Sequence, residues 1–292
     1  YKLDVVGADS RFNGVRVGLG AGGVSTNTVV GVTALNANTT GSYNAVFGIV
    51  ALYNNTTGNF NTSVGQSSLY YNVTGSNNTA IGSDALFSNT VSNNTAVGFR
   101  AGYLNTTGVE FVALGYEALR NNTTGGYNTS LGSQALKANT TVPYNTAVGR
   151  AALFSNTTSQ GNTAVGTNAL LLNVTGDYST AVGYRALENN TASNNTAVGF
   201  EAAYSNTSGV NITAFGDRAL RNSTGNENSA FGTIALFTNT TGIQNTAVGR
   251  AALYSNSTGG TNTAVGYNAL FANSTGNSNT AMGWRSLNSN TG

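Results

Sequence analysis

The chain has 292 residues, of which only 8% are charged, and its net charge is +2. This leaves no basic face for nucleic acid and no polybasic membrane patch, and no apolar run approaches the roughly 20 residues of a membrane span. Cys and His are both absent, so disulfides, thiolate ligands and the commonest metal ligand and general base are missing. We therefore expect no cofactor, no metal site and no nucleic-acid partner.

Residues 1–26 precede a long repeat and are predicted to form capping or lead-in strands. They begin with YKLDVVG at 1–7, and a glycine-rich stretch, RFNGVRVGLGAGGVSTNT, follows at 11–28. Because the chain begins at Tyr1 and shows no signal peptide, we expect a processed product or an excised segment.

Residues 27–292 form a tandem repeat in which a glycine follows an apolar residue once in every unit. The spacing of these anchor glycines is 17 residues, relaxing to 16 three times, which gives sixteen units. The anchors are Gly31, Gly48, Gly65, Gly82, Gly98, Gly115, Gly132, Gly149, Gly166, Gly183, Gly199, Gly216, Gly232, Gly249, Gly266 and Gly283. Self-similarity at a fixed period is typical of stacked-repeat architectures.

Each unit is predicted to contain a short strand, a glycine corner, a second short strand and an Asn-Thr-Thr-Gly turn. The residue before the anchor is always large and apolar, as in Val30 and Met282, and the residue four after it is usually Leu. We predict that these two columns form the core. Thr-Ala-Val alternates as a strand with one buried face should, whereas the abundance of Asn, Gly and Thr disfavours a helix.

The predicted fold class is therefore all-β: a parallel β-solenoid, of the β-roll or β-helix type, with about sixteen 17-residue coils. Strands of successive coils would lie ~4.8 Å apart, so that equivalent side chains stack in ladders. The turn Asn residues would satisfy one another's amides along the stack.

Charged residues two positions after the anchor support this register. Opposite charges alternate on successive coils, in the sets Asp84, Arg100, Glu117 and Arg185, Glu201, Arg218. In-register stacking makes such residues neighbours. Arg120 and Lys137, on adjacent coils in another column, are an exception.

Asp84 and Glu117 are the strongest catalytic candidates. They would lie two coils apart, roughly 10 Å, near the outer limit for the carboxylates of an inverting glycosidase. Arg100 would lie between them, which favours two ionised carboxylates over a raised-pKa acid and its base. We therefore predict no catalytic residue and no enzymatic activity.

Aromatic residues recur five positions after the anchor on successive coils. They are Tyr53, Tyr70, Phe87 and Tyr103, and later Phe237, Tyr254 and Phe271. If exposed, this strip would be a candidate contact for a sugar ligand or another chain, because flat rings bury area at little entropic cost. The alternative is cross-coil stacking that stiffens the solenoid.

Asn-x-Ser/Thr patterns make most turns candidate N-glycosylation sites. The candidate residues are Asn38, Asn55, Asn72, Asn105, Asn122, Asn139, Asn156, Asn173, Asn206, Asn222, Asn239, Asn256 and Asn273. A glycan-coated filament is one hypothesis, and the alternative is that Asn and Thr are turn and ladder residues.

Two further columns each leave alternatives open. The small residues two before the anchor, such as Ala80, fit either close approach of another chain or tight packing within one coil. The Thr column suggests the hypothesis of an ice-binding solenoid. Two features argue against it: the 16-residue units, and the position of Thr on the same strand face as the core Val.

The repeat NTAVGYNAL resembles the head repeats of trimeric autotransporter adhesins, although the units are longer by the Asn-Thr-Thr-Gly turn. A closer resemblance is to repeat regions of bacterial and phage tail-fibre-like proteins, in which YKLDV-x-G leads into NTAVG repeats. The resemblance implies a homotrimer or filament. It also implies a structural segment of an extracellular, cell-surface or virion fibre that spans distance and presents surface for attachment. The rival hypothesis is an adhesin that binds cell-surface polysaccharide through the aromatic strip.

Overall fold

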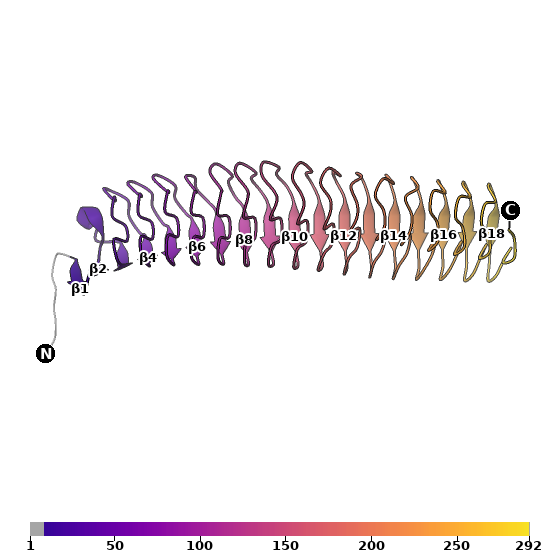
Figure 1. Cartoon of the computed structure of the whole chain (residues 1–292), viewed down its shortest axis with the longest axis horizontal. Coiled ribbons are helices and arrows are strands. Elements are labelled where there is room, and N and C mark those ends of the chain that lie inside the picture. The colour runs from indigo at the N-terminus through magenta and orange to yellow at the C-terminus, as the bar shows by residue number, and fades with distance from the viewer. Residues whose placement is uncertain (1–8, 292) are drawn as a thin grey trace. The chain divides into compact units, whose positions relative to one another are not determined.

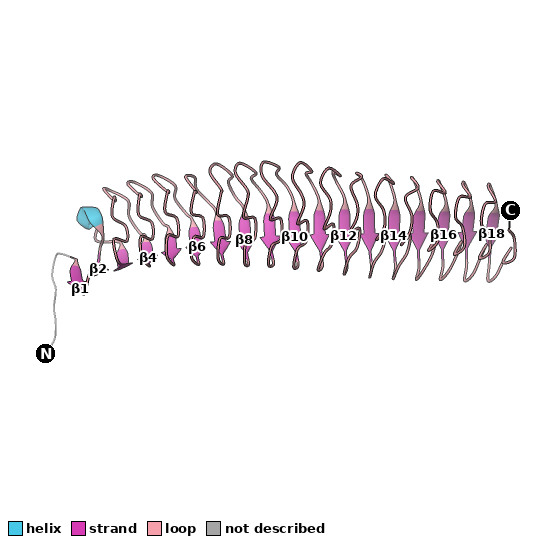
Figure 2. Ribbon diagram, viewed as in Figure 1, coloured by secondary structure: helices cyan, strands magenta, loops and turns pink. Residues whose placement is uncertain are grey.

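The computed structural model describes residues 9–291, and YKLDVVG at 1–7, predicted as part of the lead-in, lies outside the described residues. The chain divides into two compact units, residues 1–144 and 145–292. Each unit is a β-solenoid with one short strand per coil (Figures 1 and 2). The only helical element among the described residues is a 3-10 turn in the first unit. The prediction of an all-β parallel solenoid with 17-residue coils is confirmed.

The first unit begins with β1 (Ser10–Phe12), β2 (Val15–Gly18) and the 3-10 turn η1 (Ala21–Gly23). Its coils then contribute β3 (Thr28–Gly31), β4 (Ala45–Phe47), β5 (Thr62–Val64), β6 (Thr79–Ile81), β7 (Thr95–Val97), β8 (Val112–Leu114) and β9 (Thr129–Leu131). From β3 to β9 neighbouring strands are parallel and pair equivalent residues, such as Thr62 with Thr79.

The lead-in covers the first coil. β1 and β2 form an antiparallel hairpin, and β2 pairs antiparallel with β3. Arg16 Nη1 donates a 2.9 Å hydrogen bond to the carbonyl of Ala34, and Arg16 also lies 3.0 Å from Asp9. Asp9 Oδ1 in turn accepts hydrogen bonds from the amides of Leu19 and Gly20. These contacts satisfy backbone groups that an open solenoid end would leave unpaired.

The second unit continues the same pattern. Its strands are β10 (Thr146–Val148), β11 (Thr163–Val165), β12 (Thr180–Val182), β13 (Thr196–Val198), β14 (Thr213–Phe215), β15 (Ser229–Phe231), β16 (Thr246–Val248), β17 (Thr263–Val265) and β18 (Thr280–Met282). All neighbouring pairs from β10 to β18 are parallel and join equivalent residues.

The strands face the opposite way from the prediction. In the repeat strands β3 to β18 the residue two before the anchor is buried, and the large apolar residue before the anchor is half-buried or exposed. Ala164 is fully buried, for example, whereas its neighbour Val165 lies on the outer face. The prediction that the column from Val30 to Met282 belongs to the core is therefore wrong, whereas the Leu column is buried as expected in the interior coils.

The narrow interior of a coil explains this orientation. Where Ser replaces the inward Ala, its hydroxyl reaches the segment after the corner: Ser130 Oγ donates a 2.8 Å hydrogen bond to the carbonyl of Ala135. The two walls are thus so close that the inward position favours small side chains. Small residues two before the anchor therefore serve packing within the coil, and they do not lie on the surface.

The segment after the corner glycine is not the second strand that we predicted. Residues two and four after the anchor have left-handed backbone conformations, as in Arg185 (φ 57) and Leu187 (φ 51). This turn geometry lets consecutive Ala186 and Leu187 both point inward, which the alternation of a strand forbids. Its amides still bond to the next coil, as in Leu170 N to Ala186 O at 3.1 Å.

The corner requires glycine for two reasons. Gly166 has φ 134, a conformation that side chains rarely adopt. A Cβ at this position would also lie 2.4 Å from the carbonyl oxygen of Gly183 on the next coil. The invariant anchor therefore reflects backbone approach between coils.

Candidate functional site

The predicted aromatic strip forms two stacked ladders, one in each unit. In the first unit ring centroids lie 5.3 Å apart for Tyr53 and Tyr70, 5.4 Å for Tyr70 and Phe87, and 5.1 Å for Phe87 and Tyr103. In the second unit they lie 5.4 Å apart for Phe237 and Tyr254 and 5.1 Å for Tyr254 and Phe271.

The ring faces in these ladders are directed at one another. Interplanar angles within the two ladders run from 2° to 16°, and every ring is half-buried. A sugar stacks on the face of an aromatic ring, and the inner faces are already covered by neighbouring rings. The geometry thus favours cross-coil stiffening over sugar stacking.

The turn Asn residues form a buried ladder inside the coils. Asn72 Nδ2 donates hydrogen bonds to Asn55 Oδ1 at 3.0 Å and to the carbonyl of Gly75 at 2.9 Å. The same pair of bonds recurs at Asn122 and Asn256. The predicted amide ladder is confirmed.

This burial bears on the candidate glycosylation sites. Twelve of the thirteen acceptor residues are buried: Asn38, Asn55, Asn72, Asn105, Asn122, Asn139, Asn156, Asn173, Asn206, Asn239, Asn256 and Asn273. Asn222 differs, because it is half-buried and its Oδ1 accepts a 3.2 Å hydrogen bond from Arg221. A glycan on a ladder Asn would replace one of the two Nδ2 hydrogens, which bond to the preceding coil and to the residue's own turn, as at Asn72.

A second Asn ladder lies four residues before the anchors, where Asn recurs in most units of the sequence. Asn61 Nδ2 donates to the carbonyl of Gly75, and its backbone amide donates to Asn44 Oδ1. The two ladders meet where Asn94 Nδ2 donates a 3.0 Å hydrogen bond to Asn89 Oδ1. Where both ladders run, neighbouring coils are thus joined through the interior on two lines.

Charged residues of the first unit form ion pairs within and between coils. Arg100 lies 3.2 Å from Asp84, and Glu117 lies 3.2 Å from Arg120 and 2.7 Å from Lys137. Glu117 therefore explains why two cations are tolerated on adjacent coils. The hydrogen bond from Lys137 lowers the pKa of Glu117, against the opposing effect of burial.

This pairing also bears on the catalytic candidates. Asp84 pairs with Arg100, and Glu117 pairs with Lys137, whose hydrogen bond favours the ionised form of Glu117 and not a proton donor. In residues 9–291 no cluster of acidic side chains has the composition of a metal site. None of the helical segments in that range is long and apolar enough to cross a membrane.

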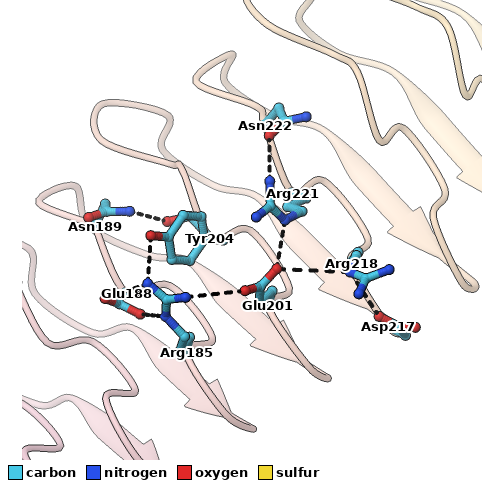
Figure 3. Close-up of polar contacts among 9 residues, drawn as sticks. All are labelled: Arg185, Glu188, Asn189, Glu201, Tyr204, Asp217, Arg218, Arg221 and Asn222. Atoms are coloured by element: carbon cyan, nitrogen blue, oxygen red, sulfur yellow. Dashed lines mark hydrogen bonds and ion pairs between the residues drawn. The ribbon is translucent and has the colours of Figure 1, made fainter.

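The second unit holds a larger network centred on Glu201 (Figure 3). Glu201 lies 3.4 Å from Arg185 on the preceding coil and 2.7 Å from Arg221 on the following coil. Arg218 lies 3.9 Å away. Glu188 hydrogen-bonds Arg185 and raises its pKa above the ordinary value of an arginine.

Tyr204 is held between two guanidinium groups of this network (Figure 3). Its ring centroid is 4.6 Å from the guanidinium carbon of Arg185 and 5.0 Å from that of Arg221. Arg185 also donates a 2.8 Å hydrogen bond to the Tyr204 hydroxyl. Three guanidinium groups face the carboxylates of Glu188, Glu201 and Asp217, so the charges of the network balance.

The outward strand residues form an uncharged apolar line that we name the outer column. It comprises Val30, Phe47, Val64, Ile81, Val97, Leu114 and Leu131 in the first unit, and Val148, Val165, Val182, Val198, Phe215, Phe231, Val248, Val265 and Met282 in the second. Phe215 and Phe231 are 44% and 41% exposed and stack at 6.0 Å. No charged residue occurs in β3 to β9 or in β10 to β18.

The outer column changes one argument about ice binding. Thr163 and Val165 share the outer face, so this face is not the core face that we had predicted. The bulky Phe215 and Phe231 nevertheless interrupt the regular Thr and Val array, and the 16-residue coils break its period. The geometry therefore still argues against ice binding.

No protein-family model, curated protein or solved structure matches the chain. The fold by itself defines the class: a β-solenoid repeat protein whose coils are joined by Asn ladders, aromatic stacks and ion pairs.

Proposed function

We propose that the chain is a non-enzymatic structural segment of an extracellular fibre, on a cell surface or a virion, that spans distance and presents surface for attachment. The buried Asn ladder, which runs unbroken over several coils at a time, carries this proposal. Asn105, Asn122 and Asn139 bond in sequence across three coils, so each added coil repeats the same buried contacts. Stability then accrues coil by coil, as a long fibre segment requires.

Self-association, as a homotrimer or a filament, is the second part of this proposal. The outer column supports it, because an apolar line free of charge along a whole unit is unusual for a monomer surface. A partner copy has the same coil spacing, so side chains of two outer columns could interdigitate along their length. The small column two before the anchors cannot serve this role, since it is buried inside the coils.

The test measures the mass of the purified chain by light scattering, with and without Phe215→Ser and Phe231→Ser. We expect the double variant to lose assembly while its circular dichroism and thermal unfolding change little. Tyr178→Ser, at a residue 59% exposed on another part of the coil, should leave assembly unchanged. A wild-type chain that stays monomeric at every concentration would contradict self-association.

The structural role is tested separately from assembly. Cryo-electron microscopy of the native fibre should show these coils within its shaft or head. Glycan-array binding that is lost on Tyr53→Ala and Tyr70→Ala would instead support the polysaccharide-binding adhesin. The covered ring faces lead us to expect no such binding.

A further inference from the structure

The interior of this solenoid does not identify which coil should stack on which. Successive coils bury the same side chains at the same places, as in the sets Ala164, Leu170, Asn173 and Ala181, Leu187, Asn190. The interface between a coil and its next-but-one neighbour, with one coil looped out, would therefore bury nearly the same side chains as a native interface. The looped-out coil would lose its own contacts, and closing a loop of this length adds little to that cost. Interior contacts thus disfavour the loss of a coil but do not select which coil is lost.

Charged residues do distinguish the coils. Glu201 is 10% exposed at its side chain and pairs with Arg185 on the coil before it and with Arg221 on the coil after it. In the first unit Arg100 pairs with Asp84 on the coil before, and Glu117 pairs with Lys137 on the coil after. These contacts are specific to one order of coils.

We propose that the two ion-pair networks fix the local stacking order by disfavouring stacks that skip one of the coils within a network. Skipping the coil of Glu201 would set Arg185 directly against Arg218. In the first unit, skipping the coil of Arg100 would set Asp84 against Glu117. Like charges opposite each other destabilise a sheet, and a buried charge that loses its partner is costly.

One contact in the skipped stack would be favourable. Glu188 and Arg221 occupy the same column, so loss of the intervening coil would bring them together. The balance of the set still changes, because Arg185, Arg218 and Arg221 would then face only Glu188 and Asp217. The skipped stack would carry one uncompensated positive charge.

The units that are one residue shorter than the others also carry residues of the ion-pair networks. The three 16-residue units start at Gly82, Gly183 and Gly216. Each of them carries a charged residue of the networks two positions later, at Asp84, Arg185 and Arg218 respectively. The coils that differ from the others in length therefore also differ from them in charge.

A cysteine pair can report a skipped coil directly, because the chain has no native Cys. Thr180 and Thr213 both pair with Thr196, which lies between them. Across two strand spacings, Thr180→Cys and Thr213→Cys would lie about 9.6 Å apart, too far for a disulfide. A skipped stack would bring them to ~4.8 Å, within disulfide range. The full chain is refolded from denaturant with an oxidant, and the yield of internal disulfide is measured.

We expect Glu201→Gln to raise this yield about tenfold, the change that roughly 1.4 kcal/mol would produce. Arg218→Glu should raise it further. That substitution sets two carboxylates against each other in the native order, and it supplies Arg185 with a carboxylate in the skipped order. Unchanged yields in both variants would overturn the proposal.

Two controls separate stacking order from general instability. A second pair, Thr246→Cys and Thr280→Cys, flanks β17 outside the network, and its yield should not respond to Glu201→Gln. Leu236→Ala weakens the core of the same unit and should leave the 180–213 yield low. If Leu236→Ala raises that yield as much as Glu201→Gln does, the ion pairs stabilise the unit without specifying its order.

Discussion

Asn122 Nδ2 donates a 2.9 Å hydrogen bond to Oδ1 of Asn105, one coil earlier, and both side chains are fully buried. The same amide donates to the carbonyl of Gly125, and its oxygen accepts from Asn139 on the next coil. Asn105 and Asn122 therefore each serve as donor and acceptor in a chain of amides. In low-dielectric surroundings such bonds strengthen one another and make any gap costly.

Replacing one link of this ladder should destabilise the first unit. Asn122→Ala removes two donated bonds and leaves Asn139 Nδ2 without one of its acceptors. We expect a loss of about 2–3 kcal/mol in the free energy of unfolding, measured by denaturant titration. Asn36→Ala, at an exposed position, should stay within about 0.5 kcal/mol. Equal effects of the two variants would contradict a structural ladder.

Two adjacent residues test the orientation of the strands. Ala164→Val adds volume inside a coil and should cost about 1–3 kcal/mol in the free energy of unfolding. Val165→Thr changes the outer face and should cost no more than about 0.5 kcal/mol. Thermal and denaturant unfolding of both variants gives the comparison. A larger loss for Val165→Thr than for Ala164→Val would contradict the burial of Ala164 and indicate that Val165 belongs to the core.

The corner glycine should tolerate no side chain. Gly166→Ala places a Cβ against the next coil's backbone at an unfavourable φ, so we expect a loss above about 3 kcal/mol or failure to fold. Gly23→Ala is the matched control, because Gly23 also has positive φ but a Cβ there meets nothing within 4 Å. Its cost should be about 1–2 kcal/mol. A similar cost at both positions would show that approach between coils does not decide the anchor.

Acid should weaken the first unit through Glu117. Folding lowers the pKa of this carboxyl, so its contribution to stability is present above the unfolded-state pKa and is lost as pH falls through the folded-state value. Unfolding titrations between roughly pH 6 and 2 should show this loss, and Glu117→Gln should flatten the profile. Glu110→Gln, at an exposed residue, should leave the profile as in the wild type. A profile that Glu117→Gln does not alter would contradict the ion-pair role.

Glycosylation offers a test of burial. If the chain is made in a host that attaches N-glycans, folded protein should carry a glycan at Asn222 alone among the candidate acceptors, since the others are buried. Glycopeptide mass spectrometry of the purified protein checks this. Sugar found on Asn72 or Asn122 of folded chains would mean that the ladder opens to admit it.

Sequence alone determined the coil period, the parallel register and the identity of the ladders. These follow from repetition, because residues that recur every 17 positions must become neighbours when the coils stack, whatever the shape of the coil. The same argument places Asp84 and Arg100, which have opposite charges, on adjacent coils, and the structure shows their ion pair.

Only the tertiary structure decided which face of each strand is buried. A period of two indicates that Ala164 and Val165 lie on opposite faces, but both faces carry apolar residues, and hydrophobicity alone favoured Val as core. The narrow interior reversed that choice, because the opposite wall lies close enough to favour a small side chain at the inward position, and only Val29 and Val46 in the first coils exceed Ala and Ser there. The left-handed turn after the corner was hidden for a related reason. In this turn the consecutive residues Ala186 and Leu187 both point inward, whereas the alternation of a strand predicts that only one of them does.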